Sequence, residues 1–141
     1  MASAIYNEYK AKVGKTDWEA VSVKVMLVTS SYTLDIDTHN NKSDIDALSV
    51  EAEGDGYNAG GKLLENKTVT RDDVNDWVRY DADDTVWSSS TITARGAIVY
   101  VDTGDATTST LIGYVDFVTD KSSSAGDFVI QWHTDGIYRI G

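Results

Sequence analysis

Two groups of acidic residues have the types and spacing that come closest to a metal-binding or catalytic site. They are Asp81, Asp83 and Asp84, and Asp35 and Asp37 with His39. Each group offers the oxygen ligands that a hard cation such as Ca²⁺ takes. Neither has the spacing of an EF-hand loop, because the glycine and the final glutamate of that loop are missing. The groups are therefore either cation ligands or solvated loop carboxylates that favour solubility.

Other reactive residue types form no catalytic pattern. His39 and His133 cannot complete a zinc site without carboxylates, and the absence of cysteine excludes thiolate ligands and disulfides. With 23 acidic residues, a glycosidase-like carboxylate pair arises easily by chance. The serine runs at 88–90 and 122–124 lack the G-x-S-x-G context of a nucleophile elbow. We predict a protein that is not an enzyme and that uses no metal and no cofactor.

Aromatic side chains are the other candidate for a binding function. They could line a carbohydrate-binding face or a subunit interface, although a β core also buries aromatic rings and is the default interpretation. The residues concerned are Trp77, Trp87, Trp132, Tyr80, Tyr100, Tyr114 and Tyr138. The four glycines between Gly54 and Gly61 lack phosphate-loop spacing and indicate turns, with Tyr57 packed between them.

Charge and hydropathy exclude two classes of partner. A net charge of −11 argues against nucleic acid, which requires clustered Lys and Arg. The longest apolar run, Val25 to Val28, is far shorter than the ~20 residues that span a bilayer. MASAIYNEYK lacks the hydrophobic region of a secretion signal. Most acids lie in 35–55 and 72–84, whereas residues 1–15 are basic. We therefore expect no nucleic acid and no membrane partner.

The elements that must position these residues are strands. From Trp77 to Trp132 the chain contains successive runs rich in Val, Ile, Thr, Tyr, Phe and Trp, each bounded by Gly, Ser, Asp or Thr. Similar runs begin near residue 20. The pattern predicts an all-β fold, an antiparallel sandwich or barrel of about eight strands. We expect less than ~20% helix, confined to the N-terminal arm and residues 43–48, against a globular average of ~30–35%.

Residues 1–19 are predicted to form a short helical or extended arm on a single β domain at 20–141. An apolar stripe at helical spacing and adjacent lysines make this arm the candidate site for binding a capsid or a neighbouring subunit. The residues are Ile5, Tyr6, Tyr9, Lys10, Lys12 and Val13. If the arm docks outward, deletion of residues 2–14 should leave the melting temperature within a few degrees. The alternative is a helix that folds back and caps one end of the sandwich.

Four segments together resemble a family of short structural proteins of tailed bacteriophages. They are VMLVTSSYTLDIDTH, GYNAGGKLLENKTVT, DADDTVWSSSTITARGAIVYVDTG and LIGYVDFVTDKSSSAGDFVIQW. The likeness extends from about Val21 to Ile140. It implies a virion protein, made in the host cytoplasm, that decorates or cements the capsid exterior and binds the major capsid protein. It brings no catalytic motif.

Decoration of a capsid favours a homo-oligomer, and we predict a trimer because closed symmetry is the rule for oligomers and local three-fold axes recur on capsids. The alternative role is a tail or fibre-associated carbohydrate-binding adhesin. Aromatic rings exposed in a concave groove would favour the adhesin, and their burial would favour decoration.

Overall fold

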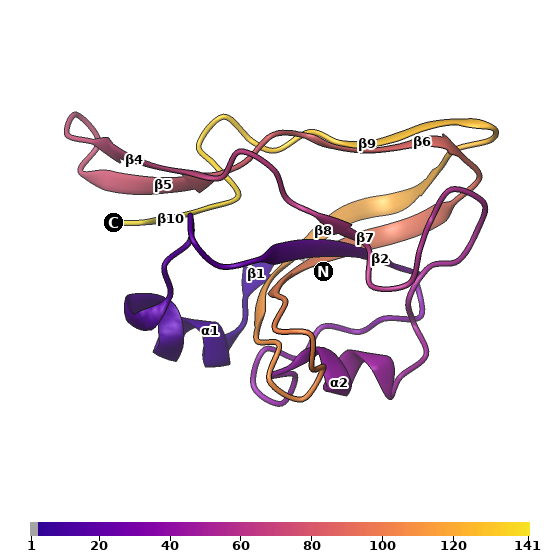
Figure 1. Cartoon of the computed structure of the whole chain (residues 1–141), viewed down its shortest axis with the longest axis horizontal. Coiled ribbons are helices and arrows are strands. Elements are labelled where there is room, and N and C mark those ends of the chain that lie inside the picture. Colours follow the sequence, from indigo (N-terminus) through magenta and orange to yellow (C-terminus); the bar gives the residue numbers. More distant parts are fainter. Residues whose placement is uncertain (1–2) are drawn as a thin grey trace.

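Antiparallel sheets make up most of the computed structural model, which describes residues 3–141 (Figure 1). Strands account for 43% of the chain and helix for 10%. The predicted all-β fold and the low helix content are both confirmed, and the arrangement is sandwich-like and not a closed barrel. Within the described residues no helix has the length and apolar character needed to cross a membrane.

A five-stranded sheet forms the centre of the molecule. Its strands, in spatial order, are β1 (Ala4–Ile5), β8 (Leu111–Ser122), β7 (Thr93–Val101), β2 (Val23–Val28) and β3 (Lys62–Leu63). The apolar run of β2 is continuous because both faces of this sheet are covered. Val23, Val25 and Leu27 belong to one buried cluster, and Met26 and Val28 belong to the other.

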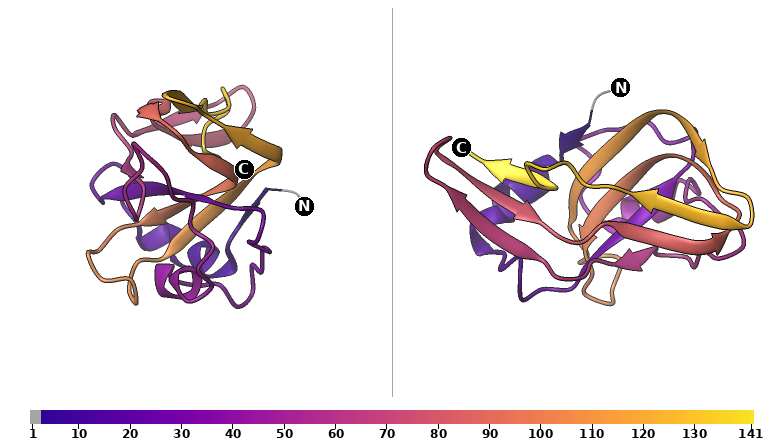
Figure 2. Two further views of the ribbon diagram at one scale, coloured as in Figure 1. Left: turned by 90° about the vertical axis from the view of Figure 1, so that its right-hand side faces the viewer. Right: turned by 90° about the horizontal axis from the view of Figure 1, so that it is seen from above.

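Two smaller sheets lie across one face of the central sheet (Figures 1 and 2). One has the order β10 (Tyr138–Ile140), β5 (Trp77–Asp81), β4 (Thr68–Asp72), and the other pairs β6 (Thr85–Ser90) with β9 (Gly126–Ile130). The core between the layers contains Trp87, Phe128 and Trp132 together with the inward side chains of β2 and β7. The β4–β5 hairpin extends beyond the central sheet, as Figure 1 shows.

The opposite face of the central sheet is covered by α2 (Lys42–Asp46) and the surrounding loops. Asn41 precedes the helix, and the Asp44 carboxylate accepts the backbone N–H of Asn41 at 2.9 Å, so the helix begins with a capping box. This helical turn was predicted at residues 43–48. Ile45 is buried against Tyr100 and Leu111.

The N-terminal segment packs on the β domain and does not stand apart from it. β1 pairs with β8, with Ala4 opposite Tyr114 and Ile5 opposite Gly113, and leads into α1 (Asn7–Lys12) and a 3₁₀ turn η1 (Val13–Lys15). Tyr6 is 0% exposed and Tyr9 is 1% exposed. The core of their own chain thus buries these two side chains, for which we predicted outward contacts.

Candidate functional site

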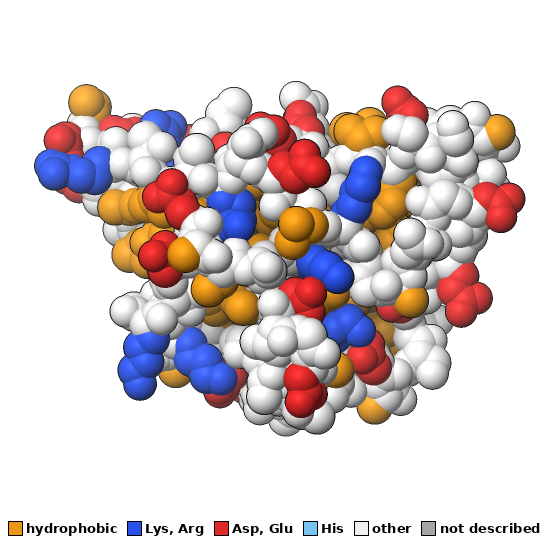
Figure 3. All heavy atoms as spheres, viewed as in Figure 1, with side chains coloured by type: hydrophobic (Ala, Val, Ile, Leu, Met, Phe, Trp, Pro, Cys, Tyr) orange, Lys and Arg blue, Asp and Glu red, His pale blue; other side chains and the backbone are white. Residues whose placement is uncertain are grey.

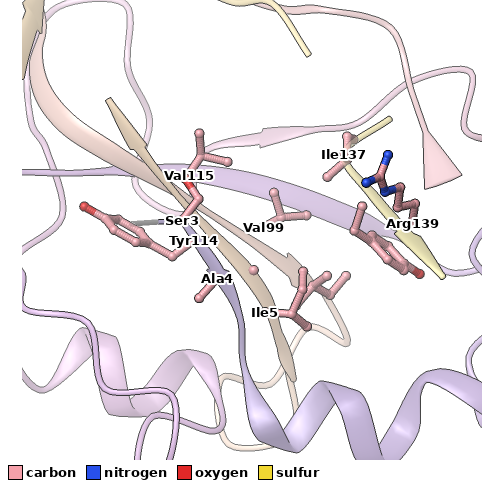
Figure 4. A pocket seen from close by; sticks show the side chains of 11 residues that line it. Ser3, Ala4, Ile5, Val99, Tyr114, Val115, Ile137 and Arg139 are labelled. Carbon is pink, nitrogen blue, oxygen red and sulfur yellow. The ribbon is translucent and has the colours of Figure 1, made fainter. Parts of the chain in front are cut away.

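A shallow groove between α1 and β10 is the candidate binding surface. We call it the terminal groove; its volume is about 260 Å³, and it is lined by Ile5, Tyr9, Lys10, Val13, Tyr138, Arg139 and Ile140. A second hollow of about 260 Å³ continues along β1 and shares Ile5, Tyr138 and Arg139 with it. Figure 4 shows this second hollow, with Ala4 and Ile5 on one side and Ile137 and Arg139 on the other.

Aromatic side chains fix the floor of the terminal groove. The Tyr9 and Tyr138 hydroxyls are hydrogen-bonded at 2.6 Å, and their rings meet edge to face with centroids 5.6 Å apart. The Trp18 ring meets Tyr138 edge to face at 5.4 Å, and its indole N–H donates to the Asp81 carbonyl at 3.1 Å. Tyr80 stacks on Tyr138 at 4.4 Å. These contacts hold α1 against β10 and β5, so the floor is a rigid part of the core.

The floor is uncharged at neutral pH. Burial raises the pKa of Tyr9. Burial also raises the pKa of Tyr138, and the hydrogen bond with Tyr9 raises it further. Both phenols therefore remain protonated at neutral pH.

The rim of the groove is positively charged. The Lys10 ammonium is exposed and donates to Asn7 Oδ1 at 3.2 Å. The Arg139 guanidinium lies 3.7 Å from the ring centroid of Trp77 and forms an ion pair with Asp135 at 3.3 Å. Figure 3 shows hydrophobic side chains between β10 and α1, with Lys and Arg side chains below them. The groove thus combines an apolar floor with basic side chains at its rim, on a chain of net charge −11.

The structure brings four of the six predicted arm residues together and separates the other two. Ile5, Tyr9, Lys10 and Val13 line the groove. Tyr6 lies on the other side of the central sheet, where its hydroxyl is hydrogen-bonded to that of Tyr32 at 2.7 Å. Lys12 turns away from the groove lining.

The Lys12 ammonium lies 2.9 Å from a Glu8 carboxylate oxygen and 3.3 Å from Thr110 Oγ1. It is therefore already partnered within the chain. The β10 side of the groove, residues 138–140, was missing from the predicted site. The sequence pattern predicts only that these residues form the last strand. A strand prediction by itself does not indicate a binding surface.

The candidate cation ligands take part in hydrogen bonds within the chain. Asp35 Oδ1 accepts the backbone N–H groups of Asp37 and Thr38 at 3.0 and 3.1 Å, and the hydrogen bonds from Thr38 lower the pKa of this carboxyl. Asp84 Oδ1 accepts the N–H of Trp132 at 3.1 Å. Among residues 3–141 no group of three or more His, Asp or Glu side chains is placed to hold a metal ion.

Most of the aromatic side chains considered for sugar binding belong to the core. The buried ones are Trp87, Tyr100, Tyr114, Trp132 and Tyr138. Trp77 and Tyr80 are half-buried, and the guanidinium of Arg139 covers the Trp77 ring. The default interpretation of these residues as core is confirmed for the buried set.

Comparison of the chain with protein-family models, with curated proteins and with solved structures found no match.

Proposed function

We propose that this chain is a bacteriophage virion structural protein that decorates or cements the outer surface of the head and assembles as a homo-oligomer, most simply a trimer. The observation that carries the binding role is the terminal groove, an apolar floor with a basic rim on an acidic β domain, which suits contact with a capsid protein or with a neighbouring subunit. The phage setting comes from the resemblance of the four segments to short virion proteins. The partner is then the major capsid protein, and the location is the exterior of the capsid.

The architecture suits a binding role better than a catalytic one. Both faces of the central sheet are closed by packed side chains, and the described residues that line the two shallow hollows include no Asp, Glu or His. A decoration protein needs a stable body and one patch that buries apolar area on the shell. The exposed Lys10 adds attraction toward an acidic surface of either partner, an effect that salt screens.

A tail or fibre-associated carbohydrate-binding adhesin is the alternative. Such a role needs aromatic faces open to solvent, and the burial of Trp87, Tyr100 and Trp132 removes those rings from a sugar platform. This burial favours decoration over the adhesin.

The test combines location and binding. Purified virions are separated into heads and tails, and the chain should be found with heads. Purified protein should bind capsids that lack it, and Lys10→Glu should weaken that binding while Lys121→Glu, on the exposed end of β8, should not. Recovery of the chain with tails, or equal capsid binding by both variants, would reject the proposal.

A further inference from the structure

The tip of the β4–β5 hairpin carries an exposed apolar side chain. We define the hairpin tip as residues 71–76, which are the last two residues of β4 and the turn that joins it to β5. Val74 is 91% exposed, more than any other large hydrophobic side chain in the described residues. A single exposed apolar residue needs no explanation by itself. At this position it is accompanied by a rigid turn and by a complementary surface elsewhere on the molecule.

Side-chain hydrogen bonds within the tip favour its folded turn conformation. Asp72 Oδ1 accepts the backbone N–H groups of Val74 and Asn75, both at 3.1 Å, and Asp72 Oδ2 accepts Asn75 Nδ2 at 2.8 Å. The Arg71 guanidinium contacts both carboxylate oxygens of Asp73 at 2.9 and 3.1 Å. A turn fixed before binding loses little conformational entropy when it docks. Val74 is thus presented by a preorganised loop.

The charges of the tip and of the terminal groove are opposite. The tip has three carboxylates against one guanidinium, and that guanidinium is already paired with Asp73. The groove rim has the exposed ammonium of Lys10 and the guanidinium of Arg139, which is paired with Asp135. The groove floor is apolar, and its volume of about 260 Å³ accommodates a branched aliphatic side chain. An apolar centre surrounded by complementary charges is the general anatomy of a specific protein interface.

A tip cannot reach the groove of its own chain. β5 pairs with β10 in antiparallel register, with Tyr80 opposite Tyr138 and Val78 opposite Ile140. The tip therefore extends past the C-terminal end of β10, while the groove lies alongside β10 toward α1 (Figures 1 and 2). A hairpin tip that fills the groove must therefore belong to another copy of the chain.

We propose that the terminal groove binds the hairpin tip of a second copy of this chain, with Val74 on the apolar floor and the tip carboxylates beside Lys10 and Arg139. Tip and groove are different surfaces of the chain, so the contact is head to tail, and it closes a small oligomer when the rotation between neighbouring copies closes. The inference deepens the self-association included in the proposed function and rests on that part alone.

The first test is the association of the full chain in solution without capsids, measured by sedimentation equilibrium over a range of concentrations. The wild type should associate, and Val74→Asp should raise the dissociation constant by about tenfold or more, as expected for a buried interface residue. Val129→Asp is the matched control, because Val129 is also an exposed valine, 52% exposed, and lies on β9 and not on the tip. The control should associate like the wild type.

Two outcomes of this test overturn the inference. One is a wild-type chain that stays monomeric up to ~1 mM, the limit of weak affinity in solution. The other is Val74→Asp protein that keeps the wild-type melting temperature and the wild-type association. Because capsids are absent, neither outcome depends on whether the chain binds a phage head.

The second test locates the contact by cross-linking and uses the lack of native cysteine. Val74→Cys protein is mixed with Val13→Cys protein, which carries its thiol in the groove, and a short bifunctional maleimide is added. A cross-linked heterodimer is expected. The control mixture pairs Val129→Cys with Val13→Cys. Equal yields from the two mixtures, or no cross-link from the first, would show that the tip does not occupy the groove.

Discussion

At Gly61 the backbone lies against the central sheet so closely that only glycine fits. Its φ is +81°, and an added Cβ would lie 1.9 Å from the Val25 carbonyl oxygen. The same loop inserts Tyr57, whose hydroxyl donates to Glu51 Oε2 at 2.6 Å and accepts the Leu27 N–H at 3.0 Å. The turn thus joins β2 to its neighbours through one glycine and one buried phenol.

We expect Gly61→Ala to destabilise the fold by about 3 kcal/mol or more, because both the φ angle and the clash with Val25 must be relieved. Gly104→Ala is the control. Gly104 has a φ of +85° but no atom within 4 Å of an added Cβ, so only the backbone penalty of ~1 kcal/mol remains. Denaturant unfolding of both variants measures the difference. Equal losses would contradict the steric argument.

The Tyr9–Tyr138 hydrogen bond supports a second prediction at this scale. Tyr9→Phe leaves the buried Tyr138 hydroxyl without its 2.6 Å partner and should destabilise the fold by ~1–3 kcal/mol. In the Tyr9→Phe/Tyr138→Phe double variant the total loss should be smaller than the sum of the single losses. A double-mutant cycle from urea unfolding gives the coupling, and additive losses would show that the two hydroxyls act independently.

The sequence predicts whether a single side chain is buried where neighbouring residues determine its packing. Tyr57 among glycines was predicted as a packed side chain, and it is buried. The apolar stripe of the arm was identified, but helical periodicity cannot tell which surface a stripe meets. In the structure the chain changes from β1 to α1 at Tyr6. Tyr6 and Tyr9 therefore enter different clusters on opposite faces of the central sheet.

Among the elements, β1 and α1 of the N-terminal segment contribute buried contacts that stabilise the domain. Deletion of residues 2–14 removes β1 and α1 and leaves the edge of β8 and the ring of Tyr138 exposed. Loss of a large buried aromatic residue costs about 3–5 kcal/mol, and total stability is typically 5–15 kcal/mol. We now expect the truncated chain to unfold or to melt at least ~15 °C lower. Calorimetry of the truncated and full chains measures this.

Lys10→Ala within the same segment is the control for that deletion, since its exposed ammonium contributes little to folding and the melting temperature should barely change. A truncated chain that melts within a few degrees of the full chain would instead support the outward-docking arm.

Most of the strands were predictable, and their arrangement was not. Residue runs alone identify the long strands β2, β7 and β8, because β-branched and aromatic residues cluster in them between polar turns. The strands β1 and β3 have two residues each and give no periodic signal. Sheet order depends on pairing between distant segments, and no local pattern encodes that Ala4 lies opposite Tyr114. The groove between α1 and β10 is a product of this pairing.

For the whole molecule, buried tyrosines predict instability at high pH. Burial raises the pKa of Tyr32 from 10.0 to about 12 and also raises the pKa of Tyr6, Tyr57 and Tyr100. A group whose pKa is higher in the folded chain stabilises it fully below the unfolded pKa and loses that contribution as the pH rises through the folded pKa. Stability should therefore fall steadily between pH 10 and about 12.

Urea midpoints across that pH range, together with phenolate absorbance, check this prediction. The buried phenols should ionise only as the chain unfolds. Ionisation of all tyrosines near pH 10 in the folded protein would contradict their burial.

The pairing of β1 with β8 has a kinetic consequence. Residues 4–5 must find residues 113–114, and Val23 must find Val101, before the central sheet is complete. Such distant partners make loop closure a large part of the folding barrier and place refolding in the range of milliseconds to seconds. The chain has no proline and no cysteine, so neither prolyl isomerisation nor thiol exchange can delay it. Stopped-flow tryptophan fluorescence should show one refolding phase, unchanged by a prolyl isomerase, whose rate reports the search for strand partners alone.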